Sequence, residues 1–206
     1  MMRSVLLCAA LAAVPLCGCA SDQTTRQPDS ALPTPTADRT AEAVAIGLRA
    51  QAARERGELD RAAELYRQAI EADNELAVLW NDLGIVLLDQ ENYPGAVDAF
   101  GQALALDRND VRPVFNLAKT YQTIGWAKEA NDFYEDALEI APQHIGATRG
   151  LVQTSAVIGR ADSTVLDAAR KGQLIDSDYR DYYERQITRI EFDMPGGRRT
   201  SRPAGG

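Results

Sequence analysis

The sequence predicts an all-α protein built from stacked helix hairpins. Residues 43–76, 77–110 and 111–144 form three segments of 34 residues that align without a gap. Aromatic residues make up only 6% of the chain and alanine is abundant, which favours close helix packing over a β-sandwich. Residues 179–192 carry Tyr and Ile at helical spacing, so the repeats are expected to end on a further helix.

The first eighteen residues have the layout of a secretory signal. Arg3 gives a positive start, and the apolar run at 4–16 is too short to cross a bilayer as a helix. The run ends in Leu-Cys-Gly-Cys at 16–19, which resembles the bacterial lipobox. We therefore expect residues 1–18 to be a lipoprotein signal peptide and Cys19 to be lipidated. An ordinary signal cut near Gly18, which would release a soluble protein, is the alternative.

The residue after the lipobox cysteine bears on localisation. In lipoproteins an Asp there is associated with retention at the inner membrane, whereas this chain has Ala20. By that resemblance we expect a protein anchored in the outer membrane through its lipid, with its body facing the periplasm. Several acyl chains would make such an anchor effectively permanent.

Two segments lack the apolar residues that a core needs. Residues 19–39 contain three prolines, many Ser and Thr, and one large apolar residue, Leu32. They are therefore expected to be a disordered tether that follows the lipidated cysteine. Residues 194–206 are expected to be a disordered tail, made basic by Arg198, Arg199 and Arg202.

Each repeat places small and large side chains at the same positions. Counted from the first residue of each repeat, these are Ala50, Gly84 and Ala118 at position 8, Ala62, Ala96 and Ala130 at position 20, and Tyr66, Phe100 and Tyr134 at position 24. The small residues are expected where two helices cross, and the aromatic residues where space remains between hairpins. Gly57 and Gly125 stand where a helix ends in positive φ, and Asn92 precedes Pro94 as a helix N-cap would.

This set of residues resembles the tetratricopeptide repeat (TPR) family. The resemblance implies a superhelical α-solenoid at 40–193, with three clear repeats at 43–76, 77–110 and 111–144. Residues 145–178 continue the period weakly, because Thr164 and Ala168 stand at positions 20 and 24. We expect them to form a degenerate fourth repeat, closed by a capping helix at 179–192.

Several classes of chemistry are disfavoured. The net charge of −8 argues against nucleic-acid binding, and all three cysteines lie in the first nineteen residues. Phosphate-binding and hydrolase motifs such as GxGxxG and GxSxG are absent from the sequence. The one histidine, His144, is expected to be an exposed turn residue. The sequence thus predicts neither an enzyme nor a metal or cofactor site.

The TPR resemblance implies that the first helices of the hairpins line a concave groove that binds protein segments. The residues at the family's groove positions include Gln51, Arg54, Asn81, Ile85, Leu88, Arg112, Phe115, Asn116, Lys119 and Arg149. The centre is apolar and the C-terminal half is basic, which suits an extended or helical peptide segment with an apolar anchor and an acidic group. The Lys/Asn/Arg clamp of some chaperone adaptors is incomplete, because Gly47 and Gln51 stand at two of its positions.

Other aromatic residues allow two interpretations each. Trp126 is expected to pack against the neighbouring hairpin, or else to form an exposed patch for a partner. The tyrosines at 179, 182 and 183 are expected to pack in the capping helix, with stacking on peptidoglycan sugars as the alternative.

The overall layout resembles the TadD family of Flp/Tad pilus-assembly TPR lipoproteins. That resemblance implies a scaffold or pilot that binds a secretin or another pilus-assembly subunit. The alternative is a periplasmic adaptor that docks peptidoglycan hydrolases. A hydrolase that uses paired carboxylates is disfavoured by the missing motifs.

Overall fold

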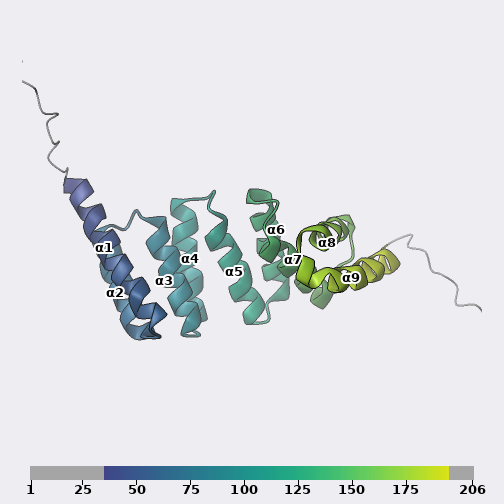
Figure 1. Ribbon diagram of the computed structural model, residues 1–206, viewed down its shortest axis with the longest axis horizontal. Helices are drawn as coiled ribbons and strands as arrows, with labels where there is room; N and C mark the ends of the chain where they lie inside the picture. The colour runs from purple at the N-terminus through teal and green to yellow at the C-terminus, as the bar shows by residue number, and fades with distance from the viewer. Residues whose placement is uncertain (1–34, 195–206) are drawn as a thin grey trace, which may run out of the picture. The chain divides into compact units, whose positions relative to one another are not determined.

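The computed structural model describes residues 35–194 of the 206-residue chain. The predicted signal peptide at 1–18, Cys19, most of the tether and residues 195–206 lie outside the described residues. Within residues 35–194 the regular structure is entirely helical, with nine α-helices and one short 3₁₀ turn (Figure 1). The prediction of an all-α fold is confirmed.

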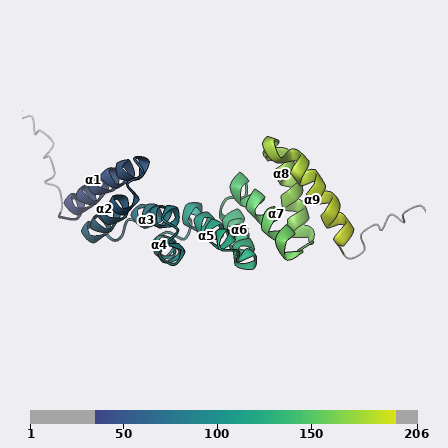
Figure 2. The ribbon, with the colours of Figure 1, turned by 90° about the horizontal axis from the view of Figure 1, so that it is seen from below.

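The helices form four successive hairpins and a final helix. The hairpins are α1 (Pro35–Glu55) with α2 (Leu59–Ala72), α3 (Ala77–Asp89) with α4 (Tyr93–Leu106), α5 (Val111–Thr123) with α6 (Ala127–Ile140), and α7 (Ile145–Ile158) with α8 (Ser163–Ile175). A 3₁₀ turn at Ser177–Tyr179 leads into α9 (Arg180–Asp193), which packs on α8. Each hairpin packs on the next, and the first helices α1, α3, α5 and α7 also contact one another in sequence (Figures 1 and 2).

The helices follow the 34-residue period. α3, α5 and α7 begin at Ala77, Val111 and Ile145, the first residues of the second, third and fourth predicted repeats. The residue at position 15 of each repeat has positive φ, as expected for Gly57 and Gly125 (77° and 85°) and found also in Gly159 (71°). In the second repeat the same position holds Glu91, with φ of 60°, a conformation that is unfavourable for a residue with a Cβ.

Both ends of the helical body differ from the sequence prediction. α1 begins at Pro35, so the prediction of a tether that reaches residue 39 is wrong at its C-terminal end. A proline fits the first helical turn, and Asp38 lies where a negative charge favours a helix N-terminus. Thr40 also donates a 2.6 Å hydrogen bond to Asp73, which joins α1 to the end of α2. At the other end Met194, predicted as the first tail residue, packs against the core.

The pairing of small and large residues explains why the hairpins are close-packed. Tyr66, Phe100 and Tyr134 are all buried, as are the small residues at positions 8 and 20 of the same repeats. A Cβ at Gly84 would overlap the ring of Phe100, and a Cβ at Gly150 would overlap the ring of Tyr134. Glycine is therefore needed at 84 and 150 because an aromatic ring lies directly on the helix backbone.

The fourth hairpin forms although it lacks the repeat's large residue. Ala168 stands where the other repeats have an aromatic side chain, and the ring of Tyr183 from α9 lies against Gly172 of α8 instead. Tyr183 and Ile190 of α9 are both fully buried. α9 thus supplies the large apolar side chain that the fourth repeat itself lacks.

Two groups of buried apolar residues make up the core. The first extends from α1 to α4 and includes Leu117 of α5, whereas the second extends from α5 to α9 and includes Val114 and Ala118 of α5. Leu104, Tyr121 and Phe133 are half-buried and pack against both groups. α5 therefore contributes one side to each core.

Candidate protein-binding face

The first helices of the hairpins are linked to one another by polar side chains. Arg54 of α1 forms a 2.8 Å ion pair with Asp89 of α3. Asn116 of α5 donates a 3.0 Å hydrogen bond to the Asn81 side chain of α3. We use the name first-helix face for the sides of α1, α3, α5 and α7 that carry the ten predicted groove residues, of which Asn81 is buried.

The apolar centre of the first-helix face comes from α3 and α5. Ile85 and Leu88 are half-buried and pack against the first core. The Phe115 ring is half-buried, with its centroid 4.5 Å from that of His144 and 6.0 Å from that of Tyr134. The ammonium group of Lys119 lies 5.9 Å from the Phe115 ring centroid. The structure therefore brings the predicted apolar anchor site and the predicted cation at 119 together.

The arginines of the first-helix face already have carboxylate partners in the chain. Arg54 pairs with Asp89, and Arg112 lies 2.6 Å from Asp110, the N-cap residue of its own helix. The hydrogen bond between this second pair raises the pKa of Arg112 and lowers that of Asp110. These pairs largely cancel the basic character that the sequence predicted for this surface.

Arg149, the most C-terminal predicted residue, is part of a network that closes the solenoid. Its guanidinium donates two 2.9 Å hydrogen bonds to the buried carboxylate of Asp176, which also accepts a 3.1 Å hydrogen bond from the Tyr183 hydroxyl. The same guanidinium lies 3.7 Å from the centroid of the Tyr179 ring. Asp176 was not predicted as a functional or structural residue, because it is 27 residues away from Arg149 in the chain.

Asp82 of α3 does not follow this pattern of ion pairs. Its carboxylate is half-buried, and within residues 35–194 it forms no ion pair with a lysine or arginine. Burial raises its pKa, although a 3.2 Å hydrogen bond from Asn81 and the charges of Arg112 and Arg54 oppose that shift. A half-buried carboxylate without a salt bridge thus lies among the residues of the first-helix face.

His144 has a different role from the one predicted. It is half-buried rather than exposed, and it is the N-cap of α7, where its Nδ1 accepts a 3.0 Å hydrogen bond from the Ala147 amide. His144 therefore caps the N-terminus of α7 beside Phe115.

Trp126 stacks on Tyr121 of its own hairpin and remains 55% exposed.

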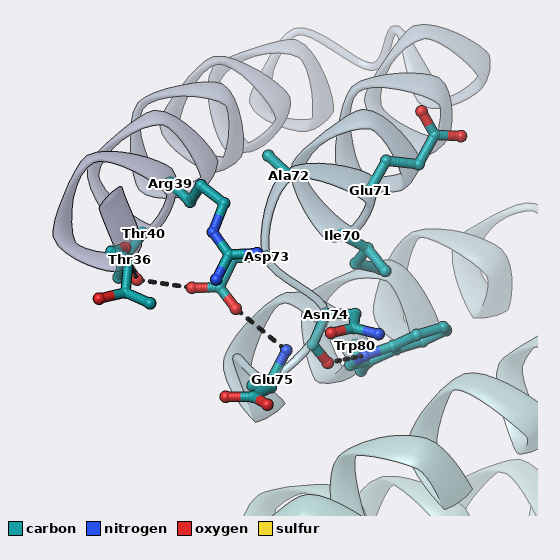
Figure 3. A pocket seen from close by; sticks show the side chains of 10 residues that line it. All are labelled: Thr36, Arg39, Thr40, Ile70, Glu71, Ala72, Asp73, Asn74, Glu75 and Trp80. Carbon is teal, nitrogen blue, oxygen red and sulfur yellow. Dashed lines mark hydrogen bonds between the residues drawn. The ribbon is translucent and has the colours of Figure 1, made fainter. Parts of the chain in front are cut away.

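A hollow lies at the N-terminal hairpin (Figure 3), and none of the ten predicted groove residues lines it. It has a volume of about 560 Å³ and lies between the start of α1 and the connection from α2 to α3. Asp73 accepts hydrogen bonds from the Thr40 hydroxyl and the Glu75 amide, which lower the pKa of its carboxyl group. The indole of Trp80 donates a 3.0 Å hydrogen bond to the Asn74 carbonyl oxygen. These polar groups are partnered with one another.

Residues 35–194 contain no group of three or more His, Cys, Asp or Glu side chains that could hold a metal ion. No helix in this range is long and apolar enough to span a bilayer.

Comparisons with known protein families match the middle of the chain. Sequence models of the tetratricopeptide repeat match residues 48–111 and residues 111–144. The human protein O-mannosyl-transferase TMTC3 is 31% identical over 81 residues, which are 39% of this chain and 9% of the relative. The peroxisomal targeting signal receptor of Candida albicans is 30% identical over 127 residues, which are 62% of this chain and 20% of the relative. The chain thus matches only a small part of each of these proteins.

Solved structures show the same fold. A crystal structure of MamA has a TM-score of 0.64 at 18% sequence identity, and the alignment covers 76% of this chain and 82% of that one. The first TPR domain of RPAP3, bound to an HSP90 peptide, has a TM-score of 0.57 at 21% identity and covers 58% of this chain and 95% of that one. The predicted TPR solenoid is thereby confirmed.

Proposed function

We propose that this chain, whose residues 48–144 are tetratricopeptide repeats, is a protein-binding scaffold that holds a segment of its partner on the first-helix face. TPR folds are typically non-catalytic protein-interaction scaffolds, and their repeats bind protein partners. The observation that carries the proposal is the half-buried apolar centre formed by Ile85, Leu88 and Phe115. Such a surface suits a peptide segment with an apolar side chain.

The finer part of the proposal concerns place and partner. The lipobox-like sequence before Cys19 and the Ala that follows it support an outer-membrane lipoprotein whose body faces the periplasm. An expected lipid anchor, a short tether and a few TPR units resemble the layout of the Flp/Tad pilus-assembly lipoproteins. We propose a scaffold or pilot role in the assembly of such a pilus or secretion machine, with a secretin or assembly subunit as partner. The second candidate, an adaptor for peptidoglycan hydrolases, shares the same layout and the same first-helix face.

Photo-cross-linking in intact cells tests the surface and the partner together. A photoreactive phenylalanine analogue at Leu88 of α3 should cross-link the partner, whereas the same analogue at the exposed Ala105 of α4 should not. Mass spectrometry of the adduct then distinguishes the candidates. A secretin or pilus-assembly subunit supports the pilot role, and a cell-wall hydrolase supports the adaptor instead. Cross-linking only at Ala105 would contradict the first-helix face as the binding site.

Truncation of the apolar residues gives an independent test of the surface. Leu88→Ala with Phe115→Ala should weaken partner capture by about tenfold or more, because both side chains are half-buried apolar residues of the first-helix face. Leu106→Ala with Leu174→Ala, at exposed apolar positions of α4 and α8, is the matched control. Unchanged capture by the double variant, with unchanged helicity, would place the binding site elsewhere.

The lipid anchor has its own test, because lipidation at Cys19 and protein binding by the repeats are independent proposals. Cys19→Ser should move the protein from the membrane fraction to the soluble fraction. Persistent membrane association of that variant would contradict lipidation at Cys19.

A further inference from the structure

Asp82 differs from three aspartates on or beside the first-helix face. Asp89, Asp110 and Asp176 each form an ion pair with an arginine, whereas within residues 35–194 the amide of Asn81 is the only polar partner of the Asp82 carboxylate. The Asn81 contact is made to one carboxylate oxygen, Oδ1. Within residues 35–194 no donor is bonded to the other oxygen, Oδ2. Asp82 thus has an acceptor available for a group from outside the chain.

The carboxylate is oriented by a short relay of amides. Asn116 of α5 donates to Oδ1 of Asn81, and Asn81 in turn donates to Asp82. Asn81 is only 2% exposed, so its amide is fixed by packing between α3 and α5. A side chain held in place in this way loses little conformational freedom when it binds a ligand.

The neighbouring positive charges do not neutralise Asp82. Arg54 and Arg112 lie near enough to affect its ionisation, but each guanidinium is directly bonded to a different carboxylate. Two arginine–aspartate pairs therefore act on a carboxylate that has no ion pair of its own in the part of the chain that the structure describes. A lysine or arginine of a partner would give Asp82 the ion pair that the neighbouring aspartates already have.

The apolar part of the face begins one helical turn away. Ile85 follows Asp82 by three residues on α3, so the two side chains share one side of the helix. Val78, four residues before Asp82, is 38% exposed on the same side. A ligand that reaches Asp82 therefore also meets apolar surface on both sides of it.

We infer that Asp82 sets the specificity of the first-helix face, by receiving a lysine or arginine side chain of the partner segment next to an apolar side chain bound at Ile85. This inference rests on the proposed function, because it names the kind of peptide that the scaffold would accept. The partner segment then combines one cationic and one large apolar side chain. It is not the acidic segment that the predicted arginines alone would have favoured.

Three degenerate peptide pools test the inference. All carry a central leucine in random small polar sequence, and they differ only in whether lysine, glutamine or glutamate occupies the flanking positions. Binding to the full chain, purified in detergent, is followed by fluorescence anisotropy of the labelled pools. The lysine pool should bind about tenfold more tightly than the glutamine pool, which is typical of a hydrogen bond to a charged group.

Variants assign the preference to Asp82. Asp82→Asn should abolish the preference for lysine while leaving the glutamine pool unchanged, and Asp82→Lys should favour the glutamate pool. The matched control is Asp98→Asn, an exposed residue on α4 with the same change of charge. Circular dichroism should show Asp82→Asn to be at least as thermostable as the unmodified chain, which separates lost recognition from lost folding.

The outcomes distinguish this inference from the function on which it rests. If the pools bind with no preference for lysine, or if Asp82→Asn keeps the preference, the assignment of Asp82 is wrong but the scaffold stands. If no pool binds even at millimolar concentration, the first-helix face is not a peptide site and both proposals fall.

Discussion

Asp176→Asn should loosen the C-terminal end of the solenoid, because Asp176 is the centre of a network that joins α7 to α9. Its carboxylate accepts two hydrogen bonds from Arg149 and one from the Tyr183 hydroxyl, and its side chain is only 4% exposed. Asparagine has nearly the same shape, so the change removes the charge without creating a cavity. The expected result is a less stable chain in which α9 is affected first.

The size of the effect follows from the exposure of the two partners. Breaking a fully buried ion pair costs about 3–5 kcal/mol, since the remaining charge is left without a partner. The Arg149 side chain is 30% exposed and can regain water, so we expect a smaller loss of about 2 kcal/mol. For a body of this size that corresponds to a melting temperature lower by about 4–8 °C.

Thermal melts followed by circular dichroism measure this difference. Asp178→Asn, two residues away and exposed, is the matched control and should shift the melting temperature by less than about 2 °C. Hydrogen exchange should show that Asp176→Asn lowers the protection of the α9 amides before that of α3 and α4. Equal melting temperatures for the two variants would refute the assignment of Asp176 as the centre of the cap.

Three further predictions concern the repeats. Glu91→Gly should raise the unfolding free energy by about 1 kcal/mol in a urea titration, because glycine adopts the φ of 60° more easily; an unchanged midpoint would count against strain at Glu91. Asp82→Asn should raise the melting temperature at pH 7. Burial raises the pKa of the Asp82 carboxyl, so the folded chain favours its neutral form. The carboxyl therefore stabilises the folded chain below its ordinary pKa, and this contribution is lost as pH rises through its pKa in the folded chain. The advantage of the variant should therefore disappear near about pH 3 in melts at both pH values, and a constant advantage would contradict this cause. Asn131→Ala should cost about 2 kcal/mol in the same urea titration, because the buried amide donates to Thr154 and Ser155 and accepts from Arg160; a loss below about 0.5 kcal/mol would show that water replaces these bonds.

The hairpins could be predicted from the sequence because the repeat constrains residue size at fixed positions. Gly84 must be small since Phe100 lies on its helix, and this pairing recurs every 34 residues in the pattern. The positive φ of Gly57 and Gly125 was equally readable from residue type. Residue type alone was therefore sufficient to predict the helix crossings and helix ends at positions where the same residue types recur in each repeat.

The ends of the body were harder to predict because they depend on contacts outside the repeat. The composition around Pro35 indicates a tether, yet α1 begins there and Thr40 bonds to Asp73 at a separation of 33 residues. Composition does not report such a contact. In the same way, the burial of Met194 requires α9 to lie on α8, which the sequence of the tail alone does not indicate.

For the candidate site, the helices that carry the residues could be predicted, but the partners of their side chains could not. The TPR resemblance implied that residues such as Ile85 and Asn116 would share the first-helix face. The pairing of Arg112 with Asp110 had a local signal, since an aspartate two residues before it is a favourable N-cap. The pairing of Arg149 with Asp176 had none, because it depends on the length and direction of α8. The absence of an ion pair at Asp82 among the described residues becomes visible only after these pairs are known.

The position of α5 between two cores has a mechanical consequence. We expect bending of the body at this helix to repack Leu104, Tyr121 and Phe133, which contact both cores, and Leu117, which joins α5 to the first core. A change of curvature at α5 therefore alters the packing of both cores at once. Since Phe115 and Asn116 lie on this helix, such a change would also move them relative to α3 and alter the surface offered to a ligand.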